Sequence, residues 1–453
     1  MLPLSQYWER GLGGEGDQVV RAYLRRVAES GRDVQLFLVY ALVSYLGLGV
    51  FALIFNLYLV RLGYDEGFIG AFNGVYTLSI GLMCLTMGFL INRFGNWWCT
   101  LFGTIIFVVV ALVLSFVTSG ALLLLLAALH GVGSAFISTT QMPFVIEWTP
   151  RRHTATIAAL SSALNSGSVM LGSLFGGLVP GIIAASTAFD TDSIEAYRWT
   201  HVAGALVTAL SIVPLLLMGQ ARRERHHADF HVARAQLPSH RVRRQARRDI
   251  VAVVLLGLFL ALGVGAIEPF YNVLLEDMGV SASAIGLIFA LSGLAATVLS
   301  VGGPMLANRI GLVAAQVWLR VFHIPVHLAL IVFPIPAVVS LAYASRRVSG
   351  SMSWPLESSH VGGLIPPRGR AHAFGMRLAA WNIGFAVAAS ISGWIIASTG
   401  SYTPAYIAVA VFSVLSVAVY VVAYGGRLPE PHDDAEPAST DAPSGSPAPA
   451  TSD

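Results

Sequence analysis

The sequence contains no lysine, because all 27 of its basic residues are arginine. The phosphate-binding loop of nucleotide-hydrolysing proteins requires a lysine, as does an enzyme that forms a Schiff base. Both classes are therefore excluded, and no nucleotide site on this chain powers its work. Cysteine is scarce too. Cys84 and Cys99 lie in or beside apolar segments, so they predict neither a disulfide framework nor a metal site.

Charge is the second thing that the sequence has little of. Only 11% of the residues are charged, whereas 55% are hydrophobic. A soluble protein of this length would carry roughly a quarter charged residues. Apolar windows of about 20 residues, each long enough to span a bilayer, recur throughout the chain. Lipid is therefore the expected solvent. Because lipid cannot satisfy backbone polar groups, the spans are predicted to be helices.

Twelve apolar segments are present, with boundaries good to about four residues. They cover residues 34–60, 68–91, 99–117, 122–148, 155–184, 197–218, 250–275, 284–307, 312–333, 336–361, 372–398 and 404–424. The pattern predicts an all-α polytopic membrane protein with a six-helix bundle in 32–218 and another in 250–424. A basic linker, 219–249, separates them.

The two ends of the chain carry no predicted span. Residues 1–31 form an N-terminal arm in which "DQVVRAYLRRVAES" reads either as a helix on the membrane surface or as a solvated segment. Residues 425–453 are rich in Pro, Ala, Ser and Asp, and are expected to be a disordered tail.

The positions of the arginines predict the orientation, because cytoplasmic loops are enriched in basic residues. If the N-terminus is cytoplasmic, 21 of the 27 arginines lie on the cytoplasmic side and only Arg61 and Arg198 lie outside. The remaining four, Arg320, Arg346, Arg347 and Arg377, fall within spans. We therefore expect a plasma (inner) membrane protein with both termini in the cytoplasm.

The chain repeats itself at an offset of 216 residues. "GFLINRFGNWW" at 88–98 is echoed by "PMLANRIGLVA" at 304–314, each a short polar island between apolar runs. Other matched pairs are Gly47 and Gly263, Gly49 and Gly265, Asn56 and Asn272, Gly63 and Gly279, and Ile69 and Ile285, followed by Gly70 and Gly286. Two parallel copies of one unit predict a substrate site at their interface, near the bilayer midplane, and rocking of one half against the other.

The first polar island resembles the loop signature of the major facilitator superfamily, Gly-x-Leu-x-Asp-Arg-x-Gly. Gly88, Leu90, Arg93 and Gly95 match, whereas Asn92 replaces the aspartate. The resemblance covers about 32–425, with the twelve-helix plan and the central loop. It implies two pseudo-symmetric six-helix bundles and transport by alternating access.

The second copy of the loop keeps Arg309 and Gly311 but has Asn308 in place of the aspartate. In the family these loops latch the two halves together on the cytoplasmic side. With asparagine, a helix cap can persist while the charge is lost. The alternative is a tight turn whose arginine sits at the lipid phosphates.

A partial antiporter signature lies in the fifth segment, "GSLFGGLVPG". Gly172, Gly176 and Gly181 match the family pattern, which favours export. Small residues spaced by four also allow any two membrane helices to approach closely, so packing is the alternative.

Charged residues inside a membrane are costly and usually face a cavity. Arg346 and Arg347 lie in the tenth segment near its middle, and His130 aligns with Arg346 at the repeat offset. Glu268, before the helix-kinking Pro269, is the first candidate for a proton-coupled group. These residues either bind a polar or anionic substrate together with the proton, or form internal salt bridges.

Other polar residues also interrupt the spans. Asn165 and Asn382 lie mid-helix at roughly equivalent positions, where they either contact substrate or join helices. Arg320, His323 and His327 share one helical face and are expected to form a structural cluster. No third ligand accompanies the two histidines, so no metal site and no cofactor are predicted.

The sequence therefore predicts secondary active transport of a small organic solute by alternating access, with proton-coupled export as one form. Proton-coupled uptake by symport of a small polar or anionic solute is the alternative. A membrane-embedded enzyme and a non-transporting sensor belong to other classes. No clustered acid, base and nucleophile supports the enzyme. The expected partners are the solute, protons and lipid, without nucleic acid, and the chain is expected to be a monomer.

Overall fold

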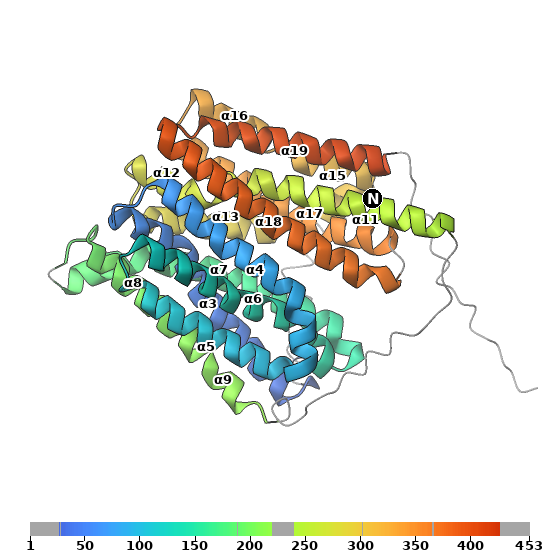
Figure 1. Cartoon of the computed structure of the whole chain (residues 1–453), viewed down its shortest axis with the longest axis horizontal. Helices are drawn as coiled ribbons and strands as arrows, with labels where there is room; N and C mark the ends of the chain where they lie inside the picture. The colour runs from blue at the N-terminus through green and yellow to red at the C-terminus, as the bar shows by residue number, and fades with distance from the viewer. Residues whose placement is uncertain are drawn as a thin grey trace, which may run out of the picture.

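The computed structural model describes residues 27, 29–187, 189–219, 240–300, 302–364 and 367–425. Every regular element within these ranges is a helix. Two groups of helices lie side by side in Figure 1, one coloured blue to green and the other yellow to red. The predicted all-α class is therefore confirmed.

The N-terminal half makes six passes. Its helices are α3 (Arg32–Arg61), α4 (Glu66–Phe94), α5 (Asn96–Leu114), α6 (Gly120–Trp148), α7 (Arg151–Ser186), and α8 (Ile194–Leu210) continued by α9 (Ile212–Leu217).

The C-terminal half makes six more, and two of its passes are interrupted within the described residues, at 266–267 and at 322–323. The six are α11 (His240–Gly265) with the 3₁₀ turn η1 (Glu268–Phe270) and α12 (Tyr271–Asp277), α13 (Ala282–Ser300) with α14 (Gly302–Ile310), α15 (Leu312–Val321) with α16 (Ile324–Val332), α17 (Pro336–Leu364), α18 (Pro367–Thr399) and α19 (Thr403–Tyr424).

The predicted twelve spans are confirmed, but apolarity alone identifies only eleven of them among the described residues. The pass that fails is α17, which is 29 residues long but carries Arg346, Arg347 and several serines. A helix this polar can cross a membrane only if other helices surround it. α17 accordingly packs against α13, α15 and α16.

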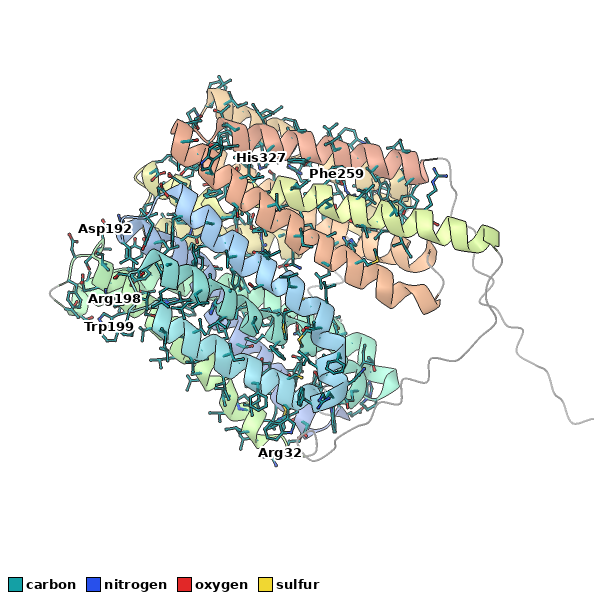
Figure 2. All side chains as sticks on the ribbon, viewed as in Figure 1. Arg32, Asp192, Arg198, Trp199, Phe259 and His327 are labelled. Atoms are coloured by element: carbon teal, nitrogen blue, oxygen red, sulfur yellow. The ribbon has the colours of Figure 1, made fainter. Side chains whose placement is uncertain are left out.

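The bundle has two ends, which we name by the turns they carry. The terminal end carries Gly31, Gly95, Gly311 and Gly425, and the distal end carries Gly63, Gly279 and Gly400. The terminal end lies to the right in Figure 1. Figure 2 labels Arg32 at the terminal end and Asp192 at the distal end.

Two pairs of repeated glycines take the same backbone conformation in both halves. Gly95 and Gly311 have φ of 85° and 87°, and Gly63 and Gly279 have φ of 88° and 79°. Residues with a Cβ are strained at these angles, so glycine is needed at each turn. The repeat in the sequence is therefore a repeat of local structure.

A reciprocal pair of hydrogen bonds joins the halves near the distal end. Asn56 Nδ2 donates to the Pro269 carbonyl oxygen at 2.7 Å. Asn272 Nδ2 donates to the Leu53 carbonyl oxygen, also at 2.7 Å. Because Leu53 and Pro269 are themselves 216 residues apart, the two bonds are exchanged by the repeat. That exchange is the relation expected of parallel repeats about a two-fold axis.

Two glycine crossings hold the halves at close range. A Cβ at Gly70 of α4 would lie 3.0 Å from the Gly393 Cα of α18. A Cβ at Gly177 of α7 would lie 3.0 Å from the Gly286 Cα of α13. These crossings are also related by the offset of 216, and each lets two helix backbones touch.

The hydrophobic cores show where the halves meet. One cluster draws on both halves, from Leu53 and Tyr58 to Phe270 and Tyr406. The clusters nearer the terminal end each belong to one half only. All hydrogen bonds between described residues of the two halves likewise lie towards the distal end. The molecule is thus joined at the distal end, while its halves have separate cores at the terminal end.

Gly177→Val should destabilise the fold, because the added side chain meets the backbone of Gly286. Overpacking of this kind costs about 1–3 kcal/mol. Gly181→Val, one turn along the same helix, is the matched control, since a Cβ there has no heavy atom within 4 Å. Thermal unfolding of the purified variants should show a lower Tm for Gly177→Val only. Equal Tm values would mean that the crossing does not hold the halves together.

Candidate functional site

The site begins at the break between α11 and α12. Helix α11 ends at Gly265, and Glu268 opens the 3₁₀ turn with Pro269 next to it. Proline cannot donate a backbone hydrogen bond, so a continuous helix is disfavoured here. The sequence predicted a kink in one helix, and the structure has a break instead. The break places the Glu268 side chain against α17.

Glu268 and Arg346 form an ion pair between the break and α17. Their side chains are 25% and 11% exposed, so the pair is neither fully buried nor in open solvent. Arg346 has no other carboxylate partner among the described residues. An internal salt bridge was one of the two alternatives that the sequence left open for these residues. What they do remains a prediction.

Aromatic and imidazole side chains lie close to the ion pair of Glu268 and Arg346. The rings of Tyr271 and Tyr343 lie 5.1 Å apart, and Tyr343 precedes Arg346 by about one turn. Tyr271 Oη is hydrogen bonded to His327 Nε2 at 2.7 Å. His327 Nδ1 lies 2.8 Å from the His323 carbonyl oxygen, which fixes the ring. His327 thus has a structural place, as expected.

Arg347 points away from the pair, because successive residues lie about 100° apart on a helix. Its Nε has no hydrogen-bond partner, and it forms no ion pair within the described part of the chain. The structure therefore brings Arg346, and not Arg347, to Glu268.

His130 lies elsewhere, in the core of the N-terminal half. It is fully buried, with ring centroids 4.0 Å from Phe107, 4.4 Å from Phe51 and 5.6 Å from Tyr76. Neither ring nitrogen has a hydrogen-bond partner among the described residues. The structure therefore does not bring His130 to Arg346, and a binding role for His130 stays a prediction. The repeat offset places His130 and Arg346 at the same height along equivalent helices, but it does not determine which side chains surround each of them.

The two mid-helix asparagines have different neighbours. Asn165 Nδ2 donates to Gln141 Oε1 at 2.7 Å, joining α7 to α6 within one half. Asn382 Nδ2 donates to the Leu378 carbonyl oxygen of its own helix, at 2.8 Å. Its Cβ faces Gly81 across the α4–α18 interface. Both therefore have a packing role, and a substrate contact remains a prediction.

The loop signature forms two tight turns at the terminal end. Asn92, Arg93, Asn308 and Arg309 are all exposed, and none makes a side-chain hydrogen bond to another described residue. The Arg93 guanidinium lies 5.7 Å from the Phe94 ring of its own turn. In this conformation neither loop latches the halves through described residues. Gly88 is likewise exposed, and Leu90 is half-buried.

The glycines of the fifth segment are explained by packing. A Cβ at Gly172 would lie 2.9 Å from the Gly49 Cα of α3, and one at Gly176 would lie 3.3 Å from the Val50 Cα. Gly181 faces no neighbour within 4 Å. The partial antiporter signature therefore needs no export function to account for it.

A buried charge network lies deeper in the C-terminal half. Glu357 Oε2 accepts from Arg320 Nη2 at 2.7 Å, and Glu357 Oε1 accepts from Arg377 Nε at 3.0 Å. The three side chains are 1–3% exposed. The structure thus buries Glu357 between two arginines. Removing one partner of such a network leaves an uncompensated charge, at a cost of about 3–5 kcal/mol.

Charged contacts close the distal end, and the sequence analysis did not find them. Arg61 Nη2 lies 2.6 Å from Glu276 Oε1, joining α3 to α12, and 3.0 Å from Asp192 Oδ1. Tyr402 Oη lies 3.0 Å from both Glu66 Oε1 and Asp277 Oδ2. The only signal in the sequence was an excess of acidic residues in these loops.

Tyr402 can act only as a donor in this contact. Burial raises the pKa of its phenol, and the carboxylates of Asp277 and Glu66 raise it further. The hydroxyl therefore keeps its proton across the physiological pH range and ties α4 of one half to α12 and α19 of the other.

The sequence pattern of the Major Facilitator Superfamily matches residues 37–345, about two thirds of the chain. The chain therefore belongs to that superfamily. It is a multi-pass membrane protein that transports a solute, not an enzyme. No cluster of His, Cys, Asp or Glu within the described residues could hold a metal ion.

Solved transporters have the same fold. A variant of the nucleoside transporter NupG superposes with a TM-score of 0.68 at 15% identity, covering 87% of this chain and all of that one. A bacterial homologue of the human lysosomal transporter Spinster, in an inward-facing and occupied conformation, gives 0.66 at 16% identity, covering 86% of this chain and 96% of that one. At such identities the likeness shows the fold alone. No curated sequence matches this chain.

Proposed function

We propose that this transporter carries out secondary active transport of a small polar or anionic solute, coupled to protons through Glu268 and Arg346. The observation that carries the proposal is the ion pair between these residues, which is partly exposed at a broken helix. An ion pair at such a place can be opened by a proton or by a competing anion.

Alternating access is supported by the asymmetry between the two ends. Hydrogen bonds, an ion pair and a shared core join the halves towards the distal end. The glycine crossings Gly70–Gly393 and Gly177–Gly286 would act as the contacts on which the halves rock. The positive-inside rule makes the terminal end cytoplasmic, so the protein faces inward in this state.

Proton coupling follows from the charge of Arg346. A guanidinium keeps its proton at all physiological pH values, so it needs an anion beside it in the membrane. When Glu268 takes up a proton, its negative charge is lost and Arg346 becomes free to bind an anionic or strongly polar solute. Proton and solute then bind together and move in the same direction.

This order of events favours uptake by symport over export. Export against protons would require the proton to displace the solute, whereas at this pair the proton makes room for it. Of the three glycines that favoured export, Gly172 and Gly176 also have a packing role against α3. In the outward-facing state, the Asn92–Arg93 and Asn308–Arg309 turns would approach one another and close the cytoplasmic end.

The solute itself is best sought by comparing the solutes retained by cells with and without the protein. The panel should include nucleosides, because NupG is a nucleoside transporter of the same fold. Flux of any solute into proteoliposomes that contain the purified chain would separate a transporter from a sensor that uses the fold without flux.

Cysteine labelling tests the proposed orientation. In a chain carrying Cys84→Ser and Cys99→Ala, Ser281→Cys marks the distal end and Asn308→Cys marks the terminal end, both at exposed positions. An impermeant maleimide added to intact cells should label Ser281→Cys but not Asn308→Cys, which should react only after lysis. Labelling of Asn308→Cys in intact cells would reverse the orientation.

Transport assays test the coupling pair. With a solute from the panel, Arg346→Ala should lower accumulation in proteoliposomes at least about tenfold, the equivalent of about 1.4 kcal/mol. Glu268→Gln should abolish accumulation driven by a pH gradient while leaving solute exchange, because its side chain is permanently neutral.

The matched control for Glu268→Gln is Glu195→Gln. Glu195 is a half-buried carboxylate near the distal end that forms no ion pair within the described residues. The Glu195→Gln variant should accumulate solute as the unaltered protein does. If Arg346→Ala and Glu268→Gln also accumulated solute normally, the pair would be structural and the coupling group would lie elsewhere.

A further inference from the structure

A cavity with both apolar and polar residues in its wall lies inside the C-terminal half, and Arg346 borders it. Its volume is about 50 Å³, and residues of α11, α15, α17, α18 and α19 line it together with His323. The polar groups of its wall are Arg320, His323, Arg346, Ser349, Ser353 and Ser413. No residue of the N-terminal half contributes to this wall.

Four of these residues have a buried polar atom with no hydrogen-bond partner among the residues that the structure describes. They are Arg320 at Nε, His323 at Nδ1, Arg346 at Nε and Ser353 at Oγ. Arg320, His323 and Ser353 are 1%, 3% and 4% exposed. A buried polar atom without a partner is unfavourable, because it has lost its hydrogen bonds to water. Four residues with such atoms line this one cavity, so a ligand held there could complete their hydrogen bonds.

All four unpartnered atoms can donate a hydrogen bond, because they belong to a guanidinium Nε–H, an imidazole N–H or a hydroxyl. Both oxygens of the neighbouring carboxylate, Glu357, are already occupied by Arg320 and Arg377. Ser349 is not available either, because it donates to the Leu319 carbonyl oxygen. The wall therefore offers donors to a ligand, which suits an anion and disfavours a cation.

The net charge around the cavity is positive, which also favours an anion. Within the spans of this half, four arginines face only two carboxylates among the described residues, Glu268 and Glu357. Arg320 and Arg377 share Glu357, which leaves one positive charge in that network. Buried charge of one sign is unfavourable unless an opposite charge compensates it.

We propose that this cavity is an anion-binding site for a halide ion or a single carboxylate group. One water needs about 10–15 Å³ of such space, so the cavity has room for a small ion. It is far smaller than the roughly 300–1,000 Å³ of a pocket that encloses an organic ligand. Only the acid group of a larger solute would therefore fit. Arg346 borders both this cavity and Glu268.

The site does not depend on the proposed proton coupling, so it can be tested by binding alone. The full chain, purified in detergent, is heated in sodium chloride or bromide, with sodium isethionate, a bulkier anion, holding the ionic strength constant. A ligand that binds only the folded state raises the Tm along a saturating curve. We expect such a curve with either halide and none with isethionate alone.

Two serine variants locate the effect. Ser353→Ala removes one donor of the cavity, worth about 1.4 kcal/mol, and should raise the half-saturating halide concentration about tenfold. Ser416→Ala is the matched control. Ser416 is also a buried serine of this half without a hydrogen-bond partner, but it does not line the cavity. Its halide response should be that of the unaltered protein.

Acetate separates the two sources of the anion. If acetate raises the Tm and competes with bromide, the site accepts a carboxylate and can hold the acid group of the solute. If only halides act, the site is one for a free inorganic ion, and both results support the proposal. A Tm that responds to neither halide nor acetate, or a Ser353→Ala response equal to that of Ser416→Ala, would show that the cavity holds water alone. Failure of the flux assay would leave these binding results unchanged.

Discussion

A guanidinium group inside a membrane keeps its charge and is costly there unless an anion compensates it. Four arginines lie within the spans of the C-terminal half, and three of them form ion pairs among the described residues. Arg320 and Arg377 enclose Glu357 and join α15, α17 and α18. Arg346 is paired with Glu268 at the break between α11 and α12, where the pair is partly exposed. The buried network around Glu357 is suited to stabilising the fold. The partly exposed pair of Glu268 and Arg346 is suited to opening and closing.

The two-fold repeat supplies the frame in which such a change can act. Asn56 and Asn272 exchange equivalent hydrogen bonds across the halves, and the two glycine crossings are related in the same way. The charge is not symmetric, because His130 occupies the place equivalent to Arg346 and lies in an aromatic core. One half therefore provides mainly packing, while the other carries the ionisable chemistry. A motion of one half against the other would change the access to Arg346 without breaking either core.

Much of the fold could be predicted from the sequence, because the governing signals are local. Apolar runs predicted the spans, and the repeated Gly95 and Gly311 marked turns that need a positive φ. Residues 336–361 were counted among the twelve apolar segments, although α17 is less apolar than the other spans. The pairing of Glu268 with Arg346 was one of the alternatives that the sequence left open, because a charge in lipid needs a partner.

The rest could not be predicted, because it depends on how helices are rotated against one another. The offset that relates His130 to Arg346 predicts the height of each residue along its helix, but it does not predict the side chains that each one contacts. The burial of Glu357 depends on two arginines that are distant in sequence, and the contacts of Arg61 and Tyr402 depend on loops from both halves. No pattern within a single helix predicts such contacts. The loop turns and the glycine crossings differ, because they recur at the offset of 216 residues.

The central claim is that the halves rock as proton and solute bind, and distances between the halves test it most directly. Spin labels at Asn92→Cys and Asn308→Cys report on the terminal end, and labels at Asp190→Cys and Ser281→Cys report on the distal end, all at exposed positions. Pulsed electron resonance in liposomes should show that acidification with solute shortens the first distance and lengthens the second. If both distances stayed fixed, or changed in the same direction, the account would be contradicted.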